Sequence, residues 1–250
     1  MTVTTRFGFF AAARELGPTV NEAEIANASL LLPLNSADNL MVNGGAPNLT
    51  EYSNYSHSMT GGSALTWYTT GGSAVTGYGG ATLFPGSVGQ QLLSPIDSSF
   101  QLGSGSWTVE FWAKPIGSGT NFSSIIQFGD GSEFYSMLVG YADNGNWVYY
   151  ISTSGSGWAV NNSMGAMVTG GHRHLALTYD GTNVRAYQDG SIVSTTAFAG
   201  TVYQNANRVS IGSSSTGYRH NGYLTDLRIL KGVAKYTGSS YTPPGPLLTY

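Results

Sequence analysis

Five Asp-Gly or Asn-Gly pairs punctuate the second half of the chain, and each lies between short segments rich in apolar and β-branched residues. They are Asp130-Gly131, Asn144-Gly145, Asp180-Gly181, Asp189-Gly190 and Asn221-Gly222. Such pairs favour tight turns, because glycine adopts positive φ at no steric cost and Asp and Asn tolerate it. Asp189-Gly190, between NVRAYQ and SIVSTT, predicts a two-residue β-hairpin.

The segments between these turns have the length and residue types of β-strands. Predicted strands cover residues 81–84, 90–94, 107–114, 124–128, 135–141, 147–153, 174–179, 184–188, 192–195, 208–211 and 223–230, after an earlier buried strand at 29–34 (SLLLPL). Many short strands at even spacing, without convincing helices, predict an all-β antiparallel sandwich or barrel.

Two kinds of segment lie outside this pattern. Residues 1–28 hold a dense share of the few charges, and we expect an N-terminal docking arm ahead of a domain at 29–250, with a frayed terminus as the alternative. Asn21 with Glu24 three positions on predicts a short helix over 21–28. The tail TPPGP (242–246) lacks the backbone donors of a central strand, so it should run outside as a closing strap.

The low charge limits the classes of partner. Charged residues make up 9% of the chain, the net charge is −3, and the ten Lys and Arg are scattered. A nucleic-acid partner is disfavoured because no basic stripe occurs. No run approaches the ~20 apolar residues of a membrane span, and no cysteine is present. A surface of Ser, Thr, Asn, Gly and Tyr favours neutral polar ligands or permanent protein partners.

A series of motifs carries a family resemblance. In order these are YGGATLFPG (78–86), WTVEFWAK (107–114), HLALTYDG (174–181), VRAYQDG (184–190), RVSIG (208–212) and GYLTDLRILKGVAKY (222–236). The chain from 29 to 250 resembles the laminin-G-like, concanavalin A-like lectin domains common in bacteriophage tail and other virion proteins. The ending LRILKGVAKYTGSSYTPP resembles the closing segment of those virion proteins.

The resemblance implies an antiparallel two-sheet jelly-roll sandwich and a non-enzymatic bacteriophage virion structural protein, as a capsid decoration or a tail or fibre component. It would be made in the host cytoplasm and lie on the virion surface. The implied partners are other virion proteins, further copies of the chain and host-surface glycans. Two alternatives stay open: a bacterial extracellular carbohydrate-binding module and, less favoured, a glycoside hydrolase of the concanavalin-like fold.

The hydrolase alternative lacks a carboxylate pair. Retaining glycoside hydrolysis needs two carboxyl groups about 5 Å apart, which alternate positions on one strand supply. The neighbours that share a face with Glu110 are Thr108, Trp112 and Lys114, and Glu133 stands alone beside a turn. We therefore expect no enzyme activity and interpret Glu110 as a hydrogen-bonded strand residue.

Two metal sites are weighed. His172 and His174 would project from one side of a strand as half of a zinc site, but no third ligand is identifiable. Calcium is the better candidate cofactor, because related sandwiches hold it on rim loops, although Asp and Asn occupy turns for conformational reasons as well. The turn residues with suitable oxygens are Asp130, Asp143, Asn144, Asp180 and Asp189.

Aromatic residues give the best functional lead. A neutral sugar needs an apolar plate with fixed donors and acceptors beside it. The predicted carbohydrate-binding residues are Trp67, Tyr68 and Tyr78, in a Gly/Ser-rich region, and Trp147, Tyr149 and Trp158, near Asn144, Asn146 and Asn161. The same side chains suit a protein interface equally well, and alternation leaves Trp147 and Tyr149 open as core residues.

Overall fold

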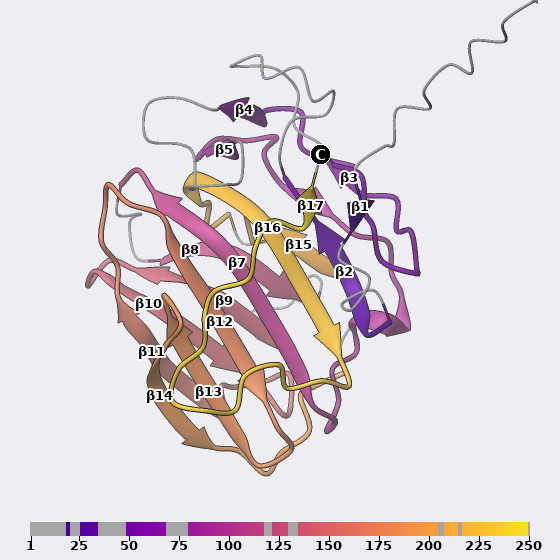
Figure 1. Cartoon of the computed structure of the whole chain (residues 1–250), viewed down its shortest axis with the longest axis vertical. Coiled ribbons are helices and arrows are strands. Elements are labelled where there is room, and N and C mark those ends of the chain that lie inside the picture. Colours follow the sequence, from indigo (N-terminus) through magenta and orange to yellow (C-terminus); the bar gives the residue numbers. More distant parts are fainter. Residues whose placement is uncertain are drawn as a thin grey trace, which may run out of the picture.

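The computed structural model describes residues 19–20, 26–34, 49–68, 80–117, 122–129, 135–204, 208–214 and 217–249. These residues form two large antiparallel sheets (Figure 1), a two-stranded sheet of β1 and β17, and one short 3₁₀ helix, η1 (Ser98–Phe100). The strands are β1 (Thr19–Val20), β2 (Ala28–Leu32), β3 (Thr60–Gly61), β4 (Thr66–Tyr68), β5 (Ala81–Pro85), β6 (Leu92–Leu93), β7 (Trp107–Pro115), β8 (Phe122–Phe128), β9 (Met137–Ala142), β10 (Asn146–Ile151), β11 (Val160–Ala166), β12 (Arg173–Tyr179), β13 (Asn183–Gln188), β14 (Ser191–Ala197), β15 (Val209–Ile211), β16 (Asn221–Lys231) and β17 (Leu248–Thr249). The predicted all-β jelly-roll sandwich is confirmed.

The two sheets face each other across one apolar core. The seven-stranded sheet has the order β11-β10-β9-β8-β15-β6-β3, and the eight-stranded sheet runs β14-β13-β12-β7-β16-β5-β4, with β2 also paired to β16. The alternation along β7 places Val109 and Phe111 in this core and turns Thr108 and Glu110 to the outer face. Each strand of the pair of sheets therefore offers one row of side chains to the core and one to the outside.

The predicted hairpin at Asp189-Gly190 joins β13 to β14. Both residues have positive φ, 51° and 81°, as a type I′ turn requires. A Cβ at position 190 would lie 2.1 Å from the carbonyl oxygen of Tyr241, so glycine is needed for space as well. The Tyr241 N–H donates to the Gly190 carbonyl at 2.7 Å, which ties the turn to the end of the chain.

That end is a strap, residues 232–247, which crosses the outer face of the eight-stranded sheet. In Figure 1 it is the yellow segment that passes in front of β12 and β7 before it reaches β17. Tyr236 packs against Ala176 and Tyr187 of the sheet below. Thr178 Oγ1 donates to the Tyr236 carbonyl at 2.8 Å and Ile192 N to the Ser239 carbonyl at 2.9 Å. The expectation that residues 242–246 run outside as a strap is confirmed.

The N-terminal expectations have mixed outcomes. Residues 1–18 and 21–25 lie outside the described residues, and β1 pairs with β17 near the C-terminus. The predicted helix over 21–28 is wrong at its last residue, because Ala28 begins β2 and pairs with Leu230. Strand β11, VNNSMGA, was missed because Asn, Ser and Gly disfavour a strand assignment. No helix among the described residues is long and apolar enough to cross a membrane.

Candidate functional site

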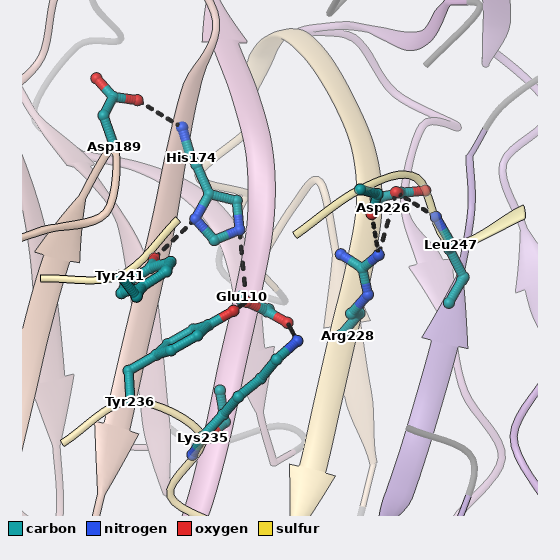
Figure 2. A network of polar contacts seen from close by, with 11 residues as sticks. Glu110, His174, Asp189, Asp226, Arg228, Lys235, Tyr236, Tyr241 and Leu247 are labelled. Carbon is teal, nitrogen blue, oxygen red and sulfur yellow. Dashed lines mark hydrogen bonds and ion pairs between the residues drawn. The ribbon is translucent and has the colours of Figure 1, made fainter. Parts of the chain in front are cut away.

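A buried carboxylate, Glu110, lies between the eight-stranded sheet and the strap. It lies on β7 (Figure 2) and is fully buried. Its Oε1 atom accepts a bond from Lys235 Nζ at 2.7 Å and its Oε2 atom accepts one from the Tyr236 hydroxyl at 2.6 Å. His174 Nε2 lies 3.4 Å from Oε2, which is long for a hydrogen bond and counts as an electrostatic contact. Both donors with short bonds come from the strap, so Glu110 fixes the strap to the sheet.

These contacts hold Glu110 in its ionised form. Burial alone would raise the pKa, but the contact with His174 and the charges of Arg228 and Lys235 outweigh it, so the pKa of Glu110 lies well below its usual range. Burial, together with the Glu110 charge, raises the pKa of Tyr236 above its usual range. The phenol therefore keeps its proton and donates a hydrogen bond to Glu110. Glu110 is thus a hydrogen-bonded structural residue, as the sequence predicted.

The His172–His174 pair is divided between two environments. His174 is buried, and its Nδ1 atom lies 2.8 Å from the Tyr241 hydroxyl. The ring of His172 lies 6.4 Å from that of Tyr223, and burial together with Lys114 lowers the pKa of His172 to about 4. The described part of the chain holds no group of three or more His, Asp or Glu residues that could bind a metal ion. The zinc half-site has no support there.

Two of the turn carboxylates proposed as calcium ligands are occupied by protein donors. Asp189 binds Arg173 Nη1 at 2.6 Å and the backbone N–H of His174 at 3.0 Å. Asp180 binds Arg185 and accepts the backbone N–H of Asn183 at 2.7 Å. These contacts fit the turn-forming role of Asp. Asp130 lies outside the described residues, and Asp143 and Asn144 are exposed in the turn between β9 and β10.

Two of the predicted sugar-binding residues belong to the core. Trp147 and Tyr149 are fully buried in the main apolar cluster, so their ring faces pack against other side chains. Their assignment to a binding surface is corrected. Alternation along β10 places both on the inner face, and Tyr149 uses its hydroxyl to reach Thr196 Oγ1 on β14 at 3.0 Å.

The other predicted residues are not brought together. Tyr68 is half-buried on β4 with its ring 6.1 Å from that of Tyr223 on the outer face of the eight-stranded sheet. Trp67 lies on β4, and Tyr78 lies outside the described residues. Trp158 belongs to a partly exposed group of aromatic rings on the other sheet.

That group is a row of four rings on the outer face of the seven-stranded sheet, which we call the aromatic row: Trp158, Tyr150, Phe122 and Tyr218. The ring centroids are 5.2 Å apart from Trp158 to Tyr150, 5.7 Å from Tyr150 to Phe122 and 5.8 Å from Phe122 to Tyr218. The first three rings are half-buried, and Tyr218 is 40% exposed. The row spans β10, β9 and β8 and combines residues that are distant in sequence.

Small and polar neighbours complete this surface. Gly140 of β9 lies beneath Phe122, since a Cβ there would come within 2.7 Å of the ring and 2.0 Å of the Ser123 carbonyl oxygen. Asn161 of β11 is exposed and lies directly opposite Tyr150 in the ladder, so both side chains are on one face. An aromatic plate beside an exposed amide can stack against a sugar ring and hydrogen-bond its hydroxyl groups.

Sequence reasoning missed three members of the row: Phe122, Tyr150 and Tyr218. In the segment NWVYYI, apolar residues occupy both faces of β10, so alternation could not say which of Tyr149 and Tyr150 turns outward. The sequence analysis placed Asn161 near Trp158, and the β10–β11 ladder pairs it with Tyr150. The signal that could have found the row is the pairing register of β8, β9 and β10.

Comparisons with known proteins agree with this architecture. The family model described as the concanavalin A-like lectin/glucanases superfamily matches residues 86–235. No curated protein sequence matches the chain. Similar solved structures include the binding domain of Paraclostridial Mosquitocidal Protein 1 (10% identity, TM-score 0.62, 82% of this chain and 49% of that chain) and the botulinum neurotoxin serotype G binding domain (13%, 0.62, 85% and 49%).

A third similar structure is domain 4 of AbnA, a GH43 extracellular arabinanase from Geobacillus stearothermophilus, in complex with arabinotriose (17% identity, TM-score 0.57, 84% of this chain and 95% of that chain). The chain spans about half the length of the two toxin binding domains but nearly all of the arabinanase domain. These identities show a shared fold. With the family model covering more than half of its residues, the chain belongs to the concanavalin A-like lectin/glucanases superfamily.

Proposed function

We propose that this chain is a non-enzymatic, glycan-binding structural protein of a bacteriophage virion, as a capsid decoration or a tail or fibre component. The observation that carries the glycan-binding part is the aromatic row with Asn161 beside it. The closing segment of the sequence, which resembles that of phage virion proteins, supports the virion part. The arabinanase domain in complex with arabinotriose supports a sugar as the ligand for a fold of this kind.

The state of the carboxylates supports binding without catalysis. Glycoside hydrolysis needs a proton donor and a second carboxylate at the sugar. Among the described acidic residues, six of the side chains accept hydrogen bonds from protein donors: Glu51, Asp97, Glu110, Asp180, Asp189 and Asp226. The most buried of them, Glu110, lies under the strap on the sheet opposite to the row. The row itself offers stacking surfaces and an amide.

The arrangement of the sheets suits attachment at one edge and recognition near the other. β1 pairs with β17, and β2 pairs with β16, so the described N-terminal segments lie beside the last two strands of the chain (Figure 1). The row lies over β8, β9 and β10, toward the edge formed by β11. In this proposal residues 1–28 dock on the particle, and the row binds host glycans. Several copies on one particle would compensate for weak single sites by avidity.

A glycan screen with matched variants tests the binding part. Trp158→Ala and Tyr218→Ala each remove one stacking surface, and we expect each to weaken binding about threefold to tenfold. Tyr55→Ala is the matched control, because Tyr55 is 53% exposed and stacks on His57, away from the row. Equal binding by the wild-type protein and both row variants would contradict the proposal, as would loss of binding in the Tyr55 variant alone.

Imaging of intact particles with a labelled antibody tests the virion part. We expect the label at a fixed position on the virion surface. The alternative, a bacterial extracellular carbohydrate-binding module, is favoured by the nearly complete coverage of the arabinanase domain. Glycan binding by a chain that is absent from purified particles and present in a bacterial secretome would establish that alternative instead.

A further inference from the structure

The aromatic row has a fixed negative charge beside it. Asp143 is exposed in the turn that joins β9 to β10, one residue after Ala142, which lies opposite Phe122 in the β8–β9 ladder. The turn is held by its own hydrogen bonds: Gly145 N donates to the Ala142 carbonyl at 3.1 Å, and Asn146 N donates to Asn144 Oδ1 at 3.1 Å. The carboxylate is therefore carried by a constrained hairpin next to the row.

The charge of Asp143 also acts on Tyr150, one of the two inner rings of the row. The pKa of Tyr150 is raised, first by burial and second by the negative charge of Asp143. A charge that opposes formation of an anion at the Tyr150 hydroxyl also opposes any other anion placed over that ring. The effect is strongest within a Debye length, about 8 Å at physiological ionic strength.

A positive charge, that of Arg219, lies near the other end of the row. Arg219 follows Tyr218, and its Nη2 atom lies 4.0 Å from where a Cβ of Gly217 would be. Tyr218 is separated from Tyr150 by the Phe122 ring. The guanidinium is thus associated with the Tyr218 end of the row, while Asp143 acts on Tyr150.

We propose that Asp143 is a specificity-determining residue that makes the aromatic row select uncharged sugars and reject those with a carboxylate, sulfate or phosphate near the β9–β10 turn. This inference rests on the proposed function, since it concerns the same surface. Stacking on the ring faces attracts neutral and anionic sugars alike. The negative charge of Asp143 repels only the anionic sugars. Discrimination by an unfavourable contact is a common source of binding specificity.

The test uses matched pairs of neutral and anionic polymers. The probes are dextran with carboxymethyl dextran, hydroxyethyl cellulose with carboxymethyl cellulose, and each neutral glycan bound in the screen with its carboxymethylated form. The variant is Asp143→Asn, which keeps the size and turn preference of the side chain and removes its charge. Asp97→Asn is the control, because it removes one negative charge elsewhere while Asn still caps η1.

We expect the wild-type protein to bind the neutral member of a pair more tightly. In Asp143→Asn the neutral-to-anionic affinity ratio should fall about twofold to fivefold at low salt, and less at high salt, as for an exposed charge. Affinity for the neutral member should not change, and Asp97→Asn should keep the wild-type ratio.

Two failures are distinguishable. If neutral glycans bind but Asp143→Asn keeps the wild-type ratio, or the wild-type protein prefers the anionic members, the role of Asp143 is refuted and the proposed function stands. If no glycan, neutral or anionic, binds to the wild-type protein, the glycan-binding part of the proposed function fails, and the role of Asp143 fails with it.

Discussion

Replacement of Glu110 by Gln separates a structural carboxylate from a functional one. The Glu110 carboxylate accepts short bonds from Lys235 and Tyr236 and is fully buried. In Glu110→Gln the amide oxygen can still accept one of these bonds, but the amide nitrogen would meet the other donor. A lost hydrogen bond to a charged group costs about 1.5–3 kcal/mol, and a broken buried ion pair costs about 3–5 kcal/mol.

Since Lys235 keeps 21% of its side chain exposed and can turn to water, we place the loss in the free energy of unfolding at about 2–4 kcal/mol. Urea denaturation followed by tryptophan fluorescence should show a lower midpoint with an unchanged slope. For a domain of this size the melting temperature should fall roughly 5–15 °C. Lys235→Met, which removes the partner from the exposed side, should also destabilise the protein.

Glycan binding should be unchanged in Glu110→Gln at a temperature where the variant is folded, because the row lies on the other sheet. Wild-type stability in Glu110→Gln would refute the assignment of Glu110 as the anchor of the strap. Normal stability together with a loss of activity on a glycan would go further and indicate a catalytic carboxylate.

Two further predictions concern pH and the strap. Burial lowers the pKa of His220 to about 3, so the unfolded state binds a proton below pH 6.5 that the folded state does not. This histidine alone should lower the unfolding free energy by about 2 kcal/mol between pH 7 and pH 5. The difference in urea midpoint between the wild-type protein and His220→Gln should therefore change in favour of the variant as the pH falls. The same difference at pH 7 and pH 5 would contradict it. In Gly190→Ala the positive φ and the Tyr241 carbonyl oxygen 2.1 Å away should lower the unfolding free energy by at least about 1 kcal/mol and increase amide exchange in the strap, whereas wild-type exchange there would contradict the tight approach.

The fold could be predicted from the sequence where local chemistry determines it. Turn geometry at Asp189-Gly190 and alternation along β7 act over a few residues, and both predictions are confirmed. The proline-rich tail excluded a central strand for physical reasons that need no tertiary structure. Strand β11 was missed because its polar residues are stabilised by tertiary contacts, such as the bond from Asn162 Nδ2 to Thr196 Oγ1 at 2.8 Å.

The site could be predicted only in part, since it depends on register. Trp158 lies in the row with rings from β8, β10 and the segment before β16, and its role in carbohydrate binding stays a prediction. A bulge between Ser124 and Ile126 shifts the β8–β9 pairing, and no local pattern reveals it. Trp147 and Tyr149 show the converse, because their size and neighbours suggested a ligand surface and the register buries them.

The most direct test of the account is an NMR titration of the protein, with labelled tyrosine and tryptophan side chains, against a glycan that binds in the screen. We predict that chemical-shift changes concentrate at Trp158, Tyr150 and Tyr218, and that the glycan is recovered intact after prolonged incubation. Shifts confined to aromatic residues of the opposite sheet, such as Tyr68 and Tyr223, or the appearance of cleaved glycan, would contradict a binding surface on the seven-stranded sheet.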